Sequence, residues 1–130
     1  MNTAQLKLQQ SIEVKVQPRY LPEQSNEELA EYTFAYTVRI ANNSDQSVQL
    51  LSRRWIITDG NNNIREVEGE GVVGQQPAIM PGESYSYSSG AILSTKTGTM
   101  EGSYKMRSFE GVDFNAIIEP FGLIHPNSLQ

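Results

Sequence analysis

The sequence predicts an all-β protein, an antiparallel β-sandwich of about seven or eight strands. Apolar and polar residues alternate with a period of two over most of the chain, as they do in strands with one buried face. Clusters of Asn, Asp, Gly and Pro interrupt this pattern roughly every 8–12 residues, the spacing typical of short strands. No segment keeps a helical period for long, so we expect no helix longer than about two turns.

The first half of the chain holds three predicted strands, at 12–17, 32–41 and 48–58. The segment 18–31 between the first two contains two prolines and is expected to be a loop with at most one helical turn. Asn and Asp favour turns at 42–46, so we expect the second and third strands to be partners across that turn. Trp55, the single tryptophan, is expected in the core. The apolar residues that define these strands are Ile12, Val14, Val16, Phe34, Tyr36, Val38, Ile40, Leu50, Leu51, Ile56 and Ile57.

The second half continues in the same way. A strand at 64–68 follows an Asp-Gly turn, and further strands are expected at 83–89, 100–109 and 114–118. The segment 90–98 is predicted to be a loop. The side chains expected on the inner or aromatic faces of these strands are Tyr85, Tyr87, Met100, Tyr104, Met106, Phe114, Ala116 and Ile118.

Composition narrows the function classes. The chain has 130 residues, enough for one domain with a single core. Ten Lys and Arg against fifteen Asp and Glu give a net charge of −5, which argues against binding to nucleic acid. There is no cysteine, and the first residues lack the features of a signal peptide. No apolar run reaches the ~18 residues of a membrane span. We therefore expect a soluble, cytoplasmic protein with no membrane partner.

The segment 68–82 contains a Gly-x-Gly-x-x-Gly run at Gly69, Gly71 and Gly74. A dinucleotide-binding turn requires a helix after the glycines, and Pro81 would fall inside that helix and break it. A phosphate-binding P-loop requires Lys and Ser or Thr where this chain has glutamines. Neither phosphate motif is complete. The three glycines instead predict a shaped turn or bulge, because glycine adopts positive φ without strain.

Several blocks of the sequence resemble one known family. The blocks are SRRWIITDGN, VEGEGVVGQQPAIMPGESYSYSSG, GTMEGSY and FNAIIEPFGL, and the resemblance covers about residues 12–124. They are similar to the ApaG family, also called CorD. The resemblance implies a single ApaG-like domain over residues 1–130, with its core over about 12–124 and a fibronectin type III or immunoglobulin-like sandwich. It also implies a link by name to cobalt resistance and magnesium efflux, and related domains that resemble interaction modules.

The glycine loop, residues 69–74, is the candidate recognition surface. Val72 and Val73 lie in its middle and are apolar, which a plain surface turn does not need. If they face outward they offer a hydrophobic contact, and if they face inward they fix the loop to the core. Both arrangements remain open. Arg53 shares a predicted strand face with Trp55, whereas Arg54 falls on the opposite face. Arg53 is therefore a further candidate, either stacked on the tryptophan or paired with an acid.

The sequence offers few candidates for catalytic or metal-binding residues. His125 is the only histidine and is expected to be a solvated residue in the tail. The run Gly82-Glu-Ser-Tyr-Ser86 lacks the last glycine of a nucleophile elbow. Glu66, Glu68 and Glu70 share one strand face and are a weak candidate site for a divalent cation such as Mg²⁺.

The expected function is therefore that of a non-enzymatic binding module, with another protein as its partner and no required cofactor. Two alternatives stay open: a factor linked to divalent-cation homeostasis, and a nucleotide or pyrophosphate binder. A homodimer is also compatible with the sequence.

Overall fold

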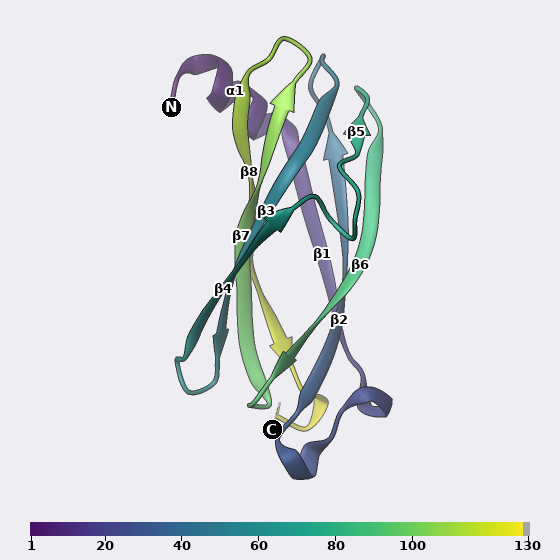
Figure 1. Ribbon diagram of the computed structural model, residues 1–130, viewed down its shortest axis with the longest axis vertical. Coiled ribbons are helices and arrows are strands. Elements are labelled where there is room, and N and C mark those ends of the chain that lie inside the picture. Colours follow the sequence, from purple (N-terminus) through teal and green to yellow (C-terminus); the bar gives the residue numbers. More distant parts are fainter. Residues whose placement is uncertain (129–130) are drawn as a thin grey trace.

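The computed structural model describes residues 1–128 and shows two antiparallel sheets packed face to face (Figure 1). One sheet has the strand order β1-β2-β6. The other has the order β4-β3-β7-β8, and the short β5 pairs with the start of β3. The predicted all-β sandwich is confirmed.

The elements have the following bounds. The strands are β1 (Ile12–Tyr20), β2 (Tyr32–Asn42), β3 (Val48–Asp59), β4 (Ile64–Glu70), β5 (Ala78–Ile79), β6 (Ser84–Leu93), β7 (Thr97–Ser108) and β8 (Asp113–Ile124). The helical elements are α1 (Thr3–Ser11) and the short 3₁₀ turns η1 (Pro22–Gln24), η2 (Glu27–Leu29) and η3 (Pro126–Ser128). The predicted loop at 90–98 is too long, because β6 and β7 extend into it and leave only a short turn between them.

The core lies between the sheets and is built from the predicted inner faces. Trp55 is 2% exposed and packs edge-on against three aromatic rings. Its ring centroid lies 5.3 Å from that of Tyr36, 5.9 Å from that of Phe121 and 6.3 Å from that of Tyr104. Edge-to-face pairs of this kind add to the stabilisation that comes from burial alone. The expectation that Trp55 is a core residue is confirmed.

The expected pairing of the second and third strands is wrong, because β2 and β3 belong to different sheets. The turn between them carries the chain across the sandwich and is fixed by the buried side chain of Asn42. Its amide nitrogen Nδ2 donates hydrogen bonds to the carbonyl oxygens of Gln46 (2.8 Å) and Ile79 (2.9 Å). Alternation cannot distinguish this crossing from a hairpin, because in both cases each strand buries one face.

The helix α1 was not expected. Asn2 and Gln5 form a capping box, in which each side chain accepts a hydrogen bond from the other residue's backbone N–H. The side-chain amides of Gln5 and Gln9 then donate to the carbonyls of Asp113 and Asn115 at the start of β8, each at 2.9 Å. Leu8 is buried, so the core begins before residue 12. With nine residues α1 has about 2.5 turns, slightly beyond the expected limit.

Within residues 1–128, no helix has both the length and the apolar character needed to cross a bilayer.

Candidate recognition site

The glycine loop closes as a tight two-residue turn. Val72 donates its N–H to the carbonyl of Gln75 (2.8 Å), and Gln75 donates back to the carbonyl of Val72 (3.0 Å). The two central residues, Val73 and Gly74, have φ values of +47° and +76°. Positive φ at both central positions is the signature of a type I′ turn, which suits hairpins. The N–H groups of Val72 and Gln75 are thus used inside the turn.

Each of the three positions in the run requires glycine for a different structural reason. Gly71 has φ +62°, and an added Cβ would lie 2.2 Å from the carbonyl oxygen of Gln75, so no other residue fits without a backbone shift. Gly69 lies against the guanidinium of Arg53, where a Cβ would come within 2.8 Å of Nη1. Gly74 has open space around it and is required only by its φ of +76°.

Arg53 fixes the loop from the adjacent strand. Its Nη1 donates to the carbonyl of Glu70 (3.0 Å) and to the carbonyl of Gly71 (2.9 Å). Gly71 also donates its N–H to the carbonyl of Leu51 on β3 (2.9 Å). The guanidinium therefore binds loop carbonyls, whereas the sequence had suggested stacking or an acidic partner. Because both contacts go to backbone carbonyls, they do not involve the side chains of Glu70 or Val73.

The sequence left open whether the two valines face inward or outward, and the structure places one in each orientation. Val72 is 0% exposed and belongs to the core, whereas Val73 is 65% exposed. A β-branched residue at positive φ is a genuine outlier, because its Cβ crowds the neighbouring carbonyl. Val73 is such a residue. The loop thus presents one strained apolar side chain to solvent on a rigidly held backbone.

The three glutamates of β4 lie on its exposed face, opposite Arg54 of β3. Arg54 forms ion pairs with Glu66 (3.1 Å) and Glu68 (3.3 Å). Across residues 1–128, no group of three His, Cys, Asp or Glu side chains lies close enough to hold a metal ion. The arrangement favours an ion-paired strand face, with Arg54 between Glu66 and Glu68.

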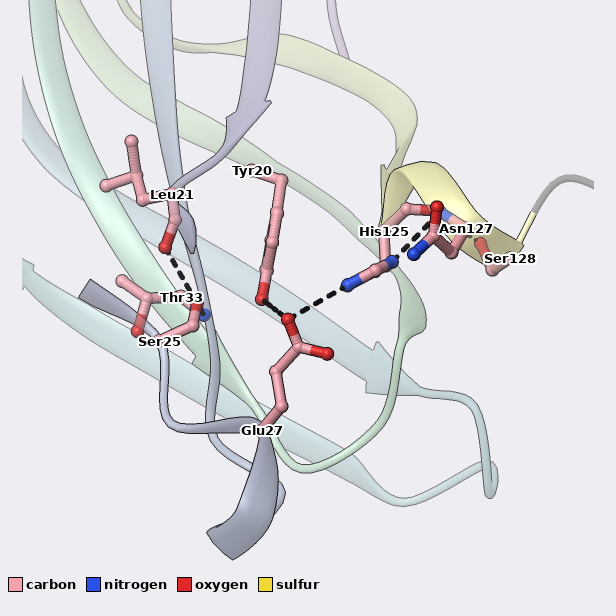
Figure 2. Close-up of polar contacts among 8 residues, drawn as sticks. All are labelled: Tyr20, Leu21, Ser25, Glu27, Thr33, His125, Asn127 and Ser128. Carbon is pink, nitrogen blue, oxygen red and sulfur yellow. Dashed lines mark hydrogen bonds and ion pairs between the residues drawn. The ribbon is translucent and has the colours of Figure 1, made fainter. Parts of the chain in front are cut away.

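The expectation that His125 is solvated is wrong, because this residue is only 4% exposed. Figure 2 shows its ring beside Tyr20 and Glu27. Its Nε2 lies 3.3 Å from Oε2 of Glu27, and Tyr20 donates its hydroxyl to the same oxygen at 2.9 Å. Nδ1 of the ring accepts the N–H of Asn127 (3.0 Å). The ring also packs against that of Tyr20, with centroids 4.5 Å apart. We call Tyr20, Glu27 and His125 the histidine clasp.

Hydrogen bonding sets the electrostatics of the clasp. The hydroxyl of Tyr20, followed by the His125 ring, stabilises the carboxylate of Glu27 and lowers its pKa. Desolvation is the main cause that raises the pKa of Tyr20. Both nitrogens of His125 are engaged, Nε2 with Glu27 and Nδ1 with the Asn127 amide, so within residues 1–128 neither pairs with a serine or threonine hydroxyl. The clasp thus joins η2 and the end of β1 to the residue that follows β8, at the lower end of the sandwich in Figure 1.

The segment Gly82–Ser86 leads into β6 and is not followed by a helix, so it lacks the strand-turn-helix context of a nucleophile elbow.

Comparisons with known proteins agree with this architecture. A family model described as the ApaG domain matches residues 22–108. A protein named ApaG from Vibrio vulnificus is 54% identical over 121 residues, covering 93% of this chain and 96% of its own. An ApaG from Pseudomonas putida is 52% identical over 118 residues, covering 91% and 94%.

Solved structures give the same result. A crystal structure of a Bordetella pertussis protein named ApaA shares 49% identity, covers 88% of this chain and 94% of that one, and has a TM-score of 0.86. The X-ray structure of a structural-genomics target shares 46% identity, covers 95% and 93%, and has a TM-score of 0.90. This chain therefore belongs to the ApaG family.

Proposed function

We propose that this chain is a non-enzymatic binding module that contacts another protein through its glycine loop. The observation that carries the proposal is Val73, which is 65% exposed and held at a φ of +47°. Such strain costs about 1–3 kcal/mol and is typical of functional positions. A glycine or asparagine in its place would relieve the strain, so the strain is the cost of presenting an apolar side chain at this position.

The way the loop is held supports recognition. Arg53 and the buried Val72 fix its backbone, so a partner would meet a surface that is already ordered. Preorganisation of this kind lowers the entropic cost of binding. Loops on a rigid sandwich are also where such domains commonly place their contacts.

The chemistry of the remaining surface supports a protein partner over the alternatives. Two of the three β4 glutamates are already paired with Arg54, which leaves a divalent cation without an assembled ligand set among residues 1–128. The turn amides of Val72 and Gln75 bond within the loop, so a pyrophosphate does not find them free. The acidic composition fits a cytoplasmic module that does not bind nucleic acid.

The test compares capture of interacting proteins from a bacterial lysate by the immobilised full chain and by two variants. Val73→Ser removes the apolar contact, and Phe109→Ser is the matched control, because Phe109 is 82% exposed on a different turn. We expect Val73→Ser to weaken capture of the main partner at least about tenfold, equivalent to ~1.4 kcal/mol. Phe109→Ser should leave capture unchanged.

The melting temperature should not fall in Val73→Ser, since the side chain buries little surface. Undiminished capture by a folded Val73→Ser protein would contradict the proposal. Titration calorimetry of the parent chain with Mg²⁺, Co²⁺ and ATP provides the complementary test, because a saturable heat signal would favour one of the two alternatives.

A further inference from the structure

The sheet edges of this protein are not protected equally. An edge strand presents unpaired backbone N–H and C=O groups, and proteins usually guard it with charges, prolines or bulges. β1 carries Pro18 and three charged residues, and β4 carries one arginine and three glutamates. β8 contains Pro120 and pairs with β7 through a register shift. Each of these three strands has at least one such device.

β6 itself has no charge, proline or bulge. Its ten residues read SYSYSSGAIL. It pairs with β2 over ten consecutive positions without a shift, and among the described strands β2 is its only partner. One side chain from another strand reaches its outer edge: Nη2 of Arg65 on β4 donates to the carbonyl of Ile92 at 3.4 Å, so the unguarded stretch is Ser84–Gly90. Figure 1 shows β6 as the green strand along the right-hand side of the molecule. Ser84, Ser86, Ser88, Ser89 and Gly90 are exposed, so another backbone can approach closely.

We propose that β6 is a docking edge for a second copy of this chain, and that the two β6 strands pair antiparallel about a two-fold axis at Ser88. The two three-stranded sheets then form one continuous six-stranded sheet. The inference concerns a different surface from the glycine loop and does not depend on the proposed function.

In this register the side chains of one β6 strand are complementary to those of the other copy. Antiparallel pairing about Ser88 places Tyr87 opposite Ser89 and Tyr85 opposite Ala91. The outermost pair, Ile92 opposite Ser84, forms when Arg65 releases the Ile92 carbonyl. Each bulky residue therefore faces a small one, and Ser86 faces Gly90. Residues directly opposite each other point to the same face of the sheet, as this register requires.

Charge also favours β6 over the other edges for self-pairing. The whole chain has a net charge of −5, so two copies repel unless they meet through a neutral surface. β6 is a neutral strip of ten residues, whereas antiparallel self-pairing of β4 would bring its glutamates together. Like charges directly opposite each other destabilise a strand pair.

The experiment measures the mass of the full chain by sedimentation velocity at physiological salt. We expect a monomer–dimer equilibrium with a dissociation constant between about 10 µM and 1 mM, the range of weak association. Ser88→Lys and Ser88→Glu should each be monomeric throughout this range, because the new charges face their own copies. An equimolar mixture of the two variants should recover the dimer, because opposite charges then face each other.

Mixing the two Ser88 variants distinguishes a loss of docking from a loss of folding. Ser88 shares a hydrogen bond with Thr37, so both variants lose that contact, and a purely structural defect would not be rescued by mixing. Gln17→Lys is the matched control: Gln17 lies in the same cross-strand row as Thr37 and Ser88 but on the opposite edge, and its variant should dimerise like the parent. A parent chain that stays monomeric at about 1 mM, a dimer that survives Ser88→Lys, or a mixture that stays monomeric would each overturn the proposal.

Discussion

The glycine loop and the histidine clasp are both held firmly, but by different parts of the chain. The loop is held mainly through backbone atoms, by Arg53 and by the hydrogen bonds of its own turn. The clasp is held through side chains, with Glu27 accepting from Tyr20 and lying against His125. The backbone contacts leave the side chain of Val73 facing solvent, whereas the side chains of the clasp contact one another.

This difference separates a surface suited to recognition from one suited to closure. A loop fixed by its backbone can change its exposed side chain without losing its shape. A segment fixed by side chains cannot change them without coming apart. The comparison therefore predicts that substitutions in the clasp act on stability, whereas substitution of Val73 acts on binding.

The largest effect is expected in the core between the two sheets. Trp55→Ala should lower the free energy of unfolding by about 3–5 kcal/mol, because the indole is 2% exposed and contacts three aromatic rings. Urea denaturation followed by circular dichroism measures the change. A loss below about 1 kcal/mol would show that the ring is not the packing centre the structure describes.

The next effect tests whether the backbone really fixes the loop. Gly71→Ala should destabilise by roughly 2–4 kcal/mol, since it combines positive φ with a 2.2 Å approach to a carbonyl oxygen. Gly74→Ala is the matched control, with positive φ but open space, and should cost only about 1–2 kcal/mol. Equal losses for the two variants would mean that the Gln75 carbonyl moves freely and that the loop is not rigid.

A smaller effect is expected in the clasp. His125→Ala should cost about 1–3 kcal/mol, because it removes a buried ring and leaves the Asn127 amide without its partner. Val73→Ser, measured beside it by thermal melting, should show no loss. If His125→Ala melted like the parent chain, the clasp would not be a structural closure and the contrast with the loop would fail.

The smallest effect is a pH dependence. The folded state lowers the pKa of Glu27, so the stabilisation from this carboxylate is fully present above its unfolded pKa and is lost as the pH falls through the folded value. The stability difference between the parent and Glu27→Gln should therefore be largest near neutral pH and shrink below about pH 4. Urea midpoints of both proteins across this range measure it, and a difference that grows on acidification would contradict the assignment.

The inner faces of the strands could be predicted because alternation is a local property. Phe34, Val38, Met106 and Ala116 lie where their strand positions place them, all at most 1% exposed. The partner of each strand could not be predicted in this way, since pairing depends on where the chain crosses between sheets. Asn42 makes that crossing through contacts up to 37 residues away.

The candidate site was predicted in part: the glycine loop and Arg53 were named from the sequence, whereas the clasp was not. The helix α1 was missed although Asn2 and Gln5 carry the spacing of a capping box, so a signal was available. The clasp had no such signal, because Glu27 and His125 are 98 residues apart. The opposite orientations of Val72 and Val73 follow from the turn type, and Val-Gly is not among the residue pairs that predict a type I′ turn.

The placement of the two ends of the sandwich has a mechanical consequence. In Figure 1, α1 lies at the upper end of the long axis and η3 at the lower end. A force that stretches the chain from its ends pulls β1 upward along β2 and β8 downward along β7. Such a force loads the nine residue pairs of the β1–β2 ladder together, in shear, and does not open them one after another. End-to-end extension therefore has to break this ladder as a unit, which is the geometry that resists stretching most.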